Sequence, residues 1–243
     1  MAERLHPLHA SGGAILAVRV VLVRPETPQN IGAVARVVRN TGLEGLDLVA
    51  PGDWRTVECW RSAWSAHEVL EGAREFRVLD EALADATFTA AFSGRRDKGV
   101  AVTDVRDLAH EVAALSEEDR AALVFGPEVS GLTLEELSRC GRRVRIPSHA
   151  AQPSMNLSHA VMVAAYEVFR AGRRPVAGTR RATHAEKERM LGLLRDGLLA
   201  RRALPEANAD GYFLEWRALF ERADLTPKEV RLLEHMARKM RGG

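Results

Sequence analysis

Cysteine is scarce in this sequence, and long hydrophobic runs are missing from it. Its 243 residues include two cysteines, Cys59 and Cys140, which are far apart and form neither a disulfide framework nor a zinc-binding pattern. No apolar run approaches the roughly 18 to 20 residues that span a bilayer, and Arg19 interrupts the apolar stretch at 13–18. We therefore expect no signal peptide, no membrane partner and a cytoplasmic location.

The glycine-rich phosphate loops of nucleotide-binding proteins are also missing. The chain contains neither G-x-G-x-x-G nor the Walker lysine pattern, so a standard dinucleotide-binding or P-loop protein is disfavoured. His149 and His159 have no cysteine or carboxylate at metal-ligand spacing. We therefore expect no metal site.

Charge is unevenly distributed, although the net charge is only +2. Residues 1–169 hold 18 basic and 23 acidic side chains, a net of −5, whereas residues 170–243 hold 17 basic and 10 acidic, a net of +7. A basic C-terminal third attracts polyanions, and nucleic acid is the leading candidate. The alternative is a solvated helical face with no partner.

Strand and helix patterns alternate over the first two-thirds of the chain. Apolar, β-branched segments predict strands at 16–23, 45–50, 76–79, 87–92, 121–126 and 143–146. Helical patterns lie at 30–41, 58–72, 104–115, 133–139 and 154–170. Strands separated by helices indicate an α/β domain with a parallel, Rossmann-like sheet covered on both faces.

The pattern changes after residue 170. Glycine, proline and arginine over 171–181 are typical of a linker, and only helical patterns follow it. We therefore divide the chain into an α/β domain at 1–170, a linker at 171–182 and a small all-α domain at 183–243. The helical domain has few residues and can form only a small core by itself. We therefore expect it to pack on the first domain or on a second copy of the chain.

Three loops follow predicted strands, at the edge where open parallel sheets bind ligands. The first runs from Arg24 to Gly32, the second from Phe125 to Thr133, and the third from Ile146 to Ala160. Each combines small residues and proline with a few polar side chains at the start of a helix. Such loops can present backbone N–H groups to a ligand.

Motifs within these loops resemble those of the SPOUT RNA ribose methyltransferases. The motifs are Asn30-Ile31-Gly32 with Arg36, Phe125-Gly126-x-Glu128-x-x-Gly131-Leu132, and Ile146-Pro147 followed by Pro153-Ser154-Met155-Asn156-Leu157. The helical segment at 213–223 is similar to that of TrmJ-like tRNA 2′-O-methyltransferases. The chain departs from the family pattern at Pro127, where arginine is common, and at Met155, where leucine is more usual.

The resemblance implies a trefoil knot in the C-terminal part of the α/β domain and a homodimer that pairs through it. It implies S-adenosylmethionine as the methyl donor, bound mainly through backbone groups of the loops. The matching cofactor-binding positions are Ser93, Gly94, Arg95, Gly126, Glu128, Ile146, Pro147, Ser154, Met155 and Leu157.

The resemblance also implies which residues act on the substrate, a tRNA ribose whose base would be cytidine or uridine 32 of the anticodon loop. The catalytic candidates are Arg36, Asn30, Glu128, Ser154 and Asn156. Arg36 would hold the phosphate and the 2′-oxygen, since a guanidinium is effectively always protonated. The alternatives are a helix cap for Asn30, Ser154 or Asn156, and an exposed loop carboxylate for Glu128.

Basic residues that follow the predicted strand at 87–92, together with basic residues of the linker, are candidates for RNA contact, with solvation as the alternative. They are Arg95, Arg96, Lys98, Arg173, Arg174, Arg180 and Arg181. We expect RNA and not DNA as the partner. Two other functions stay open: 2′-O-methylation of another tRNA or rRNA site, and a catalytically silent RNA-binding protein of the same fold.

Overall fold

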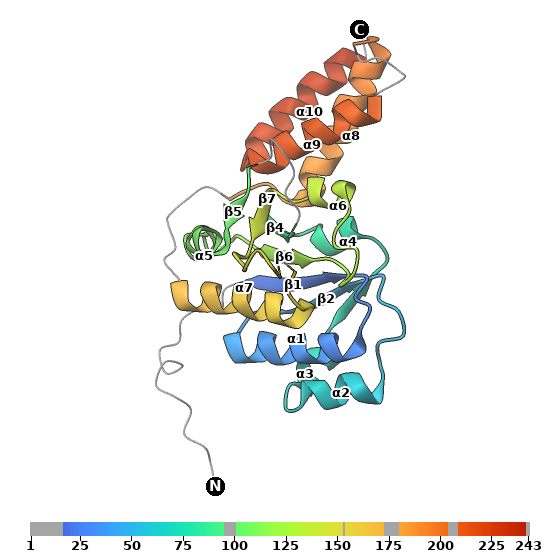
Figure 1. Ribbon diagram of the computed structural model, residues 1–243. Coiled ribbons are helices and arrows are strands. Elements are labelled where there is room, and N and C mark those ends of the chain that lie inside the picture. The colour runs from blue at the N-terminus through green and yellow to red at the C-terminus, as the bar shows by residue number, and fades with distance from the viewer. Residues whose placement is uncertain (1–16, 95–100, 153, 173–179, 204–208, 242–243) are drawn as a thin grey trace.

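A seven-stranded sheet forms the centre of the protein (Figure 1). The computed structural model describes residues 17–94, 101–152, 154–172, 180–203 and 209–241. The strand order is β3-β2-β1-β6-β4-β7-β5, and every neighbouring pair is parallel. The parallel α/β sheet predicted from the alternating pattern is therefore confirmed.

The strands are short and the helices between them differ widely in length. The strands are β1 Val18–Val23, β2 Gly45–Val49, β3 Arg74–Phe76, β4 Phe88–Phe92, β5 Thr103–Asp104, β6 Ala121–Phe125 and β7 Arg142–Arg145. The helices of the α/β part are α1 Pro28–Thr41, α2 Val57–Ala63, α3 His67–Glu71, α4 Leu79–Leu83, α5 Val105–Ala113, α6 Leu134–Ser138 and α7 Leu157–Ala171. The C-terminal helices are α8 His184–Ala200, α9 Ala209–Arg222 and α10 Pro227–Arg241.

Side chains of each central strand alternate between two cores, because successive residues of a strand point to opposite faces. In β1, Val20 and Leu22 belong to the larger core, which α1, α2, α3, α5 and α7 complete. Val21 and Val23 belong to the smaller core, to which α4 and α6 contribute Leu83 and Leu137. The sheet is thus buried on both faces, and its carboxyl edge stays open for the loops.

Several predicted boundaries are wrong. The predicted helix at 58–72 is two helices, α2 and α3, and α7 begins at Leu157 and not at 154. The strand expected at 76–79 lies at Arg74–Phe76, and Leu79–Leu83 is helical. The two-residue strand β5 had no sequence signal. Such short elements depend on tertiary pairing and not on local preference.

Several helices begin or end at residues whose side chains or backbone freedom suit the cap position. Gly42 ends α1 in the left-handed conformation, at φ 65°. Thr133 with Glu136, and Thr183 with Glu186, form complete capping boxes at the starts of α6 and α8. Thr226 and Glu229 exchange the same kind of hydrogen bonds ahead of α10.

The helices α8, α9 and α10 form a unit with its own small core, built around Met190, Leu194 and Phe213 (Figure 1). Figure 1 shows this unit at the end of the molecule that carries α6 and β7, away from α1 and α2. Backbone bonds attach its first turn to the α/β domain: the N–H of His184 donates to Ala86 O at 2.9 Å and that of Ala185 donates to Ala84 O at 3.2 Å. Across the described part of the chain, no helix is long and apolar enough to cross a membrane.

Candidate functional site

A cavity of about 330 Å³ opens at the carboxyl ends of β4, β6 and β7. Eight of the ten predicted cofactor-binding residues line it: Ser93, Gly94, Gly126, Glu128, Ile146, Ser154, Met155 and Leu157. Pro147 is not in the lining, and Arg95 lies outside the described residues. The lining thus comes from three segments, which begin at Phe92, Phe125 and Val144 and meet in one pocket.

The second loop owes its shape to two glycines. A Cβ on Gly126 would lie 2.4 Å from the backbone nitrogen of Leu132, so any other residue would push the loop apart. Gly131 has φ 65°, which favours glycine. The loop therefore folds back on itself and leaves room beside the stacked rings of Phe92 and Phe125, whose centroids are 4.3 Å apart.

Sequence reasoning missed part of the lining. Phe92 and Val144 belong to strands, and Val129, Ser130, Ser148 and Ala160 lie in or after the loops. Val129 is 88% exposed at the pocket, although it is apolar. The rule that ligands lie at the carboxyl ends of parallel strands could have found the two strand residues.

A chain of three side chains joins the three loops. Asn30 Nδ2 donates to Glu128 Oε1 at 2.7 Å, and Asn156 Nδ2 donates to Asn30 Oδ1 at 3.1 Å. Asn30 is buried in the first turn of α1, whereas Glu128 and Asn156 come from the second and third loops. Both ends of the Asn30 amide are used, so its orientation is fixed.

Glu128 also holds the backbone of the first loop. Its carboxylate accepts hydrogen bonds from the N–H groups of Glu26 at 2.9 Å and Thr27 at 3.1 Å. Burial raises the pKa of Glu128, but the hydrogen bonds from Asn30, Glu26 and Thr27 outweigh burial and lower that pKa below its ordinary value. An ionised Glu128 acts as an acceptor only, and not as a store for a proton.

Asn156 has two structural tasks. It is the N-cap of α7, where its Oδ1 accepts from the N–H groups of Ser158 at 2.9 Å and His159 at 3.3 Å. The cap considered as an alternative for Asn156 is therefore present together with the contact to Asn30. Ser154 is not the cap; it is exposed beside the pocket and accepts from Gln152 Nε2 at 3.4 Å.

Asn30 does not cap a helix, because α1 begins at Pro28 with Thr27 as its N-cap. Arg36 lies two turns further along α1 and is exposed. Among the described residues no carboxylate forms an ion pair or a hydrogen bond with it. The structure therefore brings Asn30, Glu128 and Asn156 together and leaves the guanidinium of Arg36 in solvent, on the helix that Asn30 anchors.

Two of the seven basic residues predicted to contact RNA lie within the described chain. Arg180 is 3.6 Å from Glu186, and Arg181 Nη1 donates to Asp119 Oδ2 at 2.6 Å. Asp119 is fully buried, so Arg181 holds the segment before α8 against the α/β domain. The remaining five, Arg95, Arg96, Lys98, Arg173 and Arg174, lie outside the described residues.

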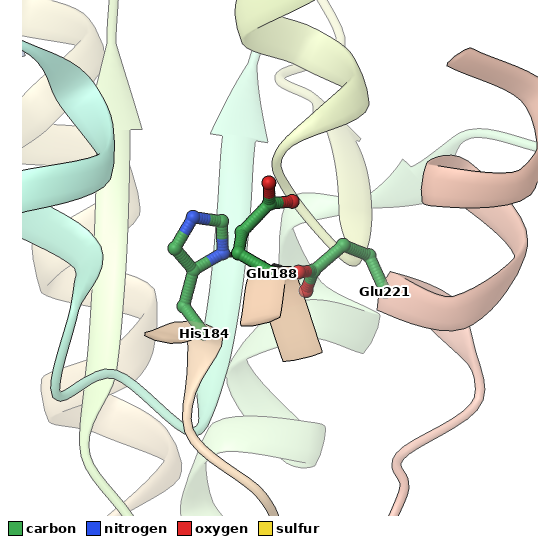
Figure 2. A group of neighbouring side chains, drawn as sticks. All are labelled: His184, Glu188 and Glu221. Carbon is green, nitrogen blue, oxygen red and sulfur yellow. Dashed lines mark hydrogen bonds and ion pairs between the residues drawn. The ribbon is translucent and has the colours of Figure 1, made fainter. Parts of the chain in front are cut away.

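Where α8 and α9 meet the α/β domain, His184, Glu188 and Glu221 place three possible metal ligands within 4.8 Å of one another (Figure 2). Their donor atoms already have partners. His184 Nδ1 lies 3.0 Å from Glu221 and its Nε2 lies 3.1 Å from Asp80. Glu221 also binds Lys187 Nζ at 2.5 Å, and Arg217 binds Glu188 through two nitrogens.

The protonation of His184 decides the nature of this cluster. Burial lowers the pKa of His184, but hydrogen bonds to Asp80 and Glu221 raise it to about 9. At neutral pH both ring nitrogens then carry protons and donate to carboxylates, and a protonated imidazole does not bind metal. We interpret the cluster as a buried ion-pair network that attaches the helical unit to the α/β domain.

Together, the sheet and the pocket define an α/β protein whose ligand site is built from the segments that follow β4, β6 and β7 at the carboxyl edge of parallel strands. Residues 17–166 match the SpoU rRNA Methylase family, and the chain belongs to this family. The trefoil knot that the resemblance implies stays a prediction.

Curated relatives extend the similarity beyond the α/β domain. The chain is 32% identical over 224 residues to the tRNA (cytidine-2′-O-)-methyltransferase TrmJ of Methanocaldococcus jannaschii, covering 89% of this chain and 96% of that one. It is 33% identical over 225 residues to the tRNA (cytidine/uridine-2′-O-)-methyltransferase TrmJ of Escherichia coli K12, covering 89% and 92%. The chain is thus homologous to tRNA 2′-O-methyltransferases over most of its length.

Solved structures agree with this. TrmJ from Zymomonas mobilis superposes with a TM-score of 0.81 at 28% identity, over 91% of this chain and 98% of that one. A structure described as giving insight into 2′-OH methylation of C/U34 on tRNA has a TM-score of 0.52 at 30% identity and covers 63% of this chain and 95% of that one. Because the first structure matches 91% of this chain, the helices α8–α10 belong to a shared architecture.

Proposed function

We propose that this protein transfers a methyl group from S-adenosylmethionine to the 2′-hydroxyl of a tRNA ribose. The observation that carries the proposal is the chain from Glu128 through Asn30 to Asn156, which joins all three loops beside the pocket. It links the cofactor-sized cavity to the helix that presents Arg36. The TrmJ relatives support tRNA as the substrate.

The pocket fits S-adenosylmethionine by size and by chemistry. Its volume is in the range of small-molecule sites. Phe92, Phe125, Ile146 and Leu157 supply apolar walls, and the glycine-shaped second loop can offer backbone N–H groups. A carboxylate, Glu128, stands at the wall where a cationic sulfonium would be favoured.

The residues that line the pocket, Ile146 and Leu157 among them, would hold S-adenosylmethionine, which would supply an electrophilic sulfonium methyl group for transfer to the 2′-oxygen. Arg36 would hold the neighbouring phosphate and stabilise negative charge on the 2′-oxygen as its proton leaves. Asn30, oriented by Glu128, fixes the first turn of the helix that carries Arg36. Asn156 and Ser154 shape the third loop against the pocket.

For the target nucleotide we propose cytidine or uridine at position 32 of the anticodon loop. The names of the relatives support the two bases, and one relative's name adds adenosine. The solved structure that concerns C/U34 of tRNA makes position 34 the alternative target nucleotide. If the target were another tRNA or rRNA nucleotide, the cofactor pocket and the role of Arg36 would be the same.

We propose a homodimer from a partly exposed apolar stripe on α7. Met162, Tyr166 and Phe169 lie on one face of this helix at helical spacing and are 37%, 46% and 37% exposed. Met155, at the pocket, is 39% exposed close to the start of the same helix. A second copy of the chain would bury this stripe and bring its own basic surface near the pocket.

We propose that the α/β domain ends at residue 170 and that the linker ends at residue 182. The helical unit that follows would be the element that captures tRNA. Its surface carries exposed cations such as Lys228, Arg231 and Lys239 on α10. We propose the cytoplasm as the location, where tRNA is available as the substrate.

Mapping of 2′-O-methylation tests the proposal directly. Purified protein, S-adenosylmethionine and unmodified tRNA transcripts should yield a 2′-O-methyl group at position 32, and the Arg36→Ala variant should not. Methylation at position 34 alone would replace the assignment of the site. No methylation of any tRNA, together with no heat of cofactor binding by the metal-free protein, would overturn the proposed function.

A further inference from the structure

Two carboxylates from one segment hold the loop between β1 and α1 at both of its ends. Glu128 accepts from the N–H groups of Glu26 and Thr27, as described above. Eight residues later in the chain, Glu136 binds the guanidinium of Arg24, the first residue after β1. The contact between Arg24 and Glu136 lies outside the pocket lining and outside the chain of three side chains formed by Glu128, Asn30 and Asn156.

The carboxylate of Glu136 is oriented by the capping box of α6 as well as by Arg24. Glu136 is the third residue of α6, and its Oε2 accepts from the backbone N–H of Thr133 at 2.8 Å in the capping box. Arg24 then engages both oxygens, Oε1 through Nη1 and Oε2 through Nη2 at 3.1 Å. The side chain of Glu136 is 13% exposed and that of Arg24 is 43% exposed, so the carboxylate is shielded while the guanidinium partly faces solvent. Two-point geometry makes such a pair stronger than a single contact between exposed charges.

The backbone of Arg24 needs such support. Its φ is 44°, in the left-handed region that glycine adopts more readily than arginine. Its N–H donates to Val49 O at 2.8 Å, which ties the turn to β2. The chain bends at Arg24, and the N–H groups of the two residues after Pro25 donate to Glu128.

We propose that Arg24 and Glu136 are a positioning pair for methyl transfer. By holding the start of the β1–α1 loop, the pair presents the N–H groups of Glu26 and Thr27 to Glu128 and thereby sets the orientation of Asn30. Neither residue touches substrate or cofactor. The effect on turnover rests on the proposed function, whereas the effect on the loop is a property of the protein alone.

Two variants separate the pair from its surroundings. Glu136→Gln removes the charge but keeps the capping box, since glutamine closes it as well as glutamate. Arg24→Met removes the guanidinium and keeps a long side chain. The matched control is Glu135→Gln on the same helix, which loses only the exposed contact to Arg139.

The first readout is hydrogen exchange at the amides of Glu26 and Thr27 in the free protein. Loss of a two-point, charge-assisted pair should speed exchange by on the order of tenfold in Glu136→Gln and Arg24→Met, with no change in Glu135→Gln. Arg24→Gly separates the role of the guanidinium from that of the backbone conformation, because glycine adopts the left-handed turn readily. Hydrogen exchange at Glu26 and Thr27 should become faster in this variant too. Exchange that stays unchanged in all three variants would show that the pair does not hold the loop.

The second readout is turnover on tRNA. Both variants should lower kcat by on the order of tenfold while the Kd for S-adenosylmethionine stays within about twofold, because the pocket loop keeps its cap. Arg24→Lys should recover part of the rate, as it restores the charge without the two-point geometry. A loss of rate matched by a loss of cofactor affinity or of thermal stability would make the pair merely structural and overturn the proposal.

The two readouts keep the proposals distinguishable. A wild-type protein that methylates no tRNA overturns the proposed function, and the exchange rates still decide whether the pair holds the loop. An active wild type with unaffected variants overturns the positioning pair alone.

Discussion

The side-chain amide of Asn156 donates a hydrogen bond to the side chain of Asn30 at 3.1 Å, across 126 positions of sequence. Asn156 caps α7 and Asn30 lies in the first turn of α1, so the contact links the starts of two helices that pack side by side. The third loop of the pocket and the helix of Arg36 are thereby held in one arrangement. A change on either side of this contact should act on the other.

Substitution of Asn30 by aspartate tests that link. Asn30→Asp would place a second carboxylate beside Glu128, 2.7 Å away in the wild type, and the repulsion would raise the pKa of Glu128 and separate the two groups. We expect turnover to fall by on the order of tenfold or more at pH 8 and to recover partly at lower pH, where one carboxylate is protonated. Gln29→Glu adds the same charge to the neighbouring exposed position and should leave turnover and its pH profile unchanged. Equal pH profiles for the two variants would count against the link.

Arg36→Ala should nearly abolish methyl transfer without harming the fold. The side chain is exposed, so its loss leaves no cavity. Loss of a group that stabilises developing charge typically lowers the rate by about 10²- to 10³-fold. Arg39→Ala, on the same helix and paired with Glu68, is the control and should stay active with a similar Tm. An Arg36→Ala variant that retains most of the wild-type turnover would remove Arg36 from the mechanism.

The ion-pair network around His184 should make stability depend on alkaline pH. Hydrogen bonds to Asp80 and Glu221 raise the pKa of His184 from about 6.5 to about 9 against the effect of burial, so the folded state binds the proton more tightly than the unfolded state. This stabilisation is complete below pH 6.5 and is lost as the pH rises through 9. It amounts to about 3 kcal/mol.

Urea unfolding at pH 6 and pH 9.5 measures this effect. The free energy of unfolding of the wild type should fall between the two pH values, and that of His184→Gln should be lower at pH 6 and change less. His235→Gln, at an exposed position of α10, should follow the wild type. A wild type and a His184→Gln variant with the same pH dependence would show that His184 is not protonated in the fold.

Removal of the helical unit should weaken tRNA binding more than cofactor binding. A chain ending at Ala171 keeps every described residue of the pocket lining but loses Arg181, and with it the cation paired with the buried Asp119. We expect the cofactor Kd to change little, and tRNA affinity and its salt dependence to fall, at some loss of stability. Measurement of its oligomeric state separates lost RNA contacts from lost dimerisation.

A full-length variant tests tRNA capture by the helical unit without exposing the surface between this unit and the α/β domain. Lys228→Gln with Arg231→Gln removes two exposed charges of α10, and each lost phosphate contact should lower the salt slope by about 0.7 to 0.9. Unchanged affinity and slope in both proteins would show that the helical unit does not capture tRNA.

The stripe on α7 predicts an obligate interface between two copies of the chain. Tyr166→Asp places a charge in the middle of the stripe and should shift the protein from dimer to monomer in sedimentation at micromolar concentration. Met236→Asp, at a comparably exposed apolar side chain of α10, should leave the dimer intact. A wild type that sediments as a 26.7 kDa species and is fully active would exclude the dimer.

By itself the sequence determined the parallel α/β class, the three strand-end loops and the helix starts at Thr133 and Thr183. These features depend on neighbours in the chain: periodicity, β-branched runs and capping boxes act over a few residues. The motif residues Asn30, Glu128 and Asn156 could likewise be selected from the sequence, but only as three separate candidates.

Only the tertiary structure decided what those residues do to one another. Glu128 and Asn30 are 98 positions apart, and the buried pair of Arg181 and Asp119 is 62 apart, so no local pattern could join them. The short α4 and β5 escaped prediction for the same reason, since elements of five and two residues form by packing and pairing and not by their own preference. Hydrogen bonds and ion pairs depend on distance in space, and that distance is set by the strand order, which the residues along any one segment do not encode.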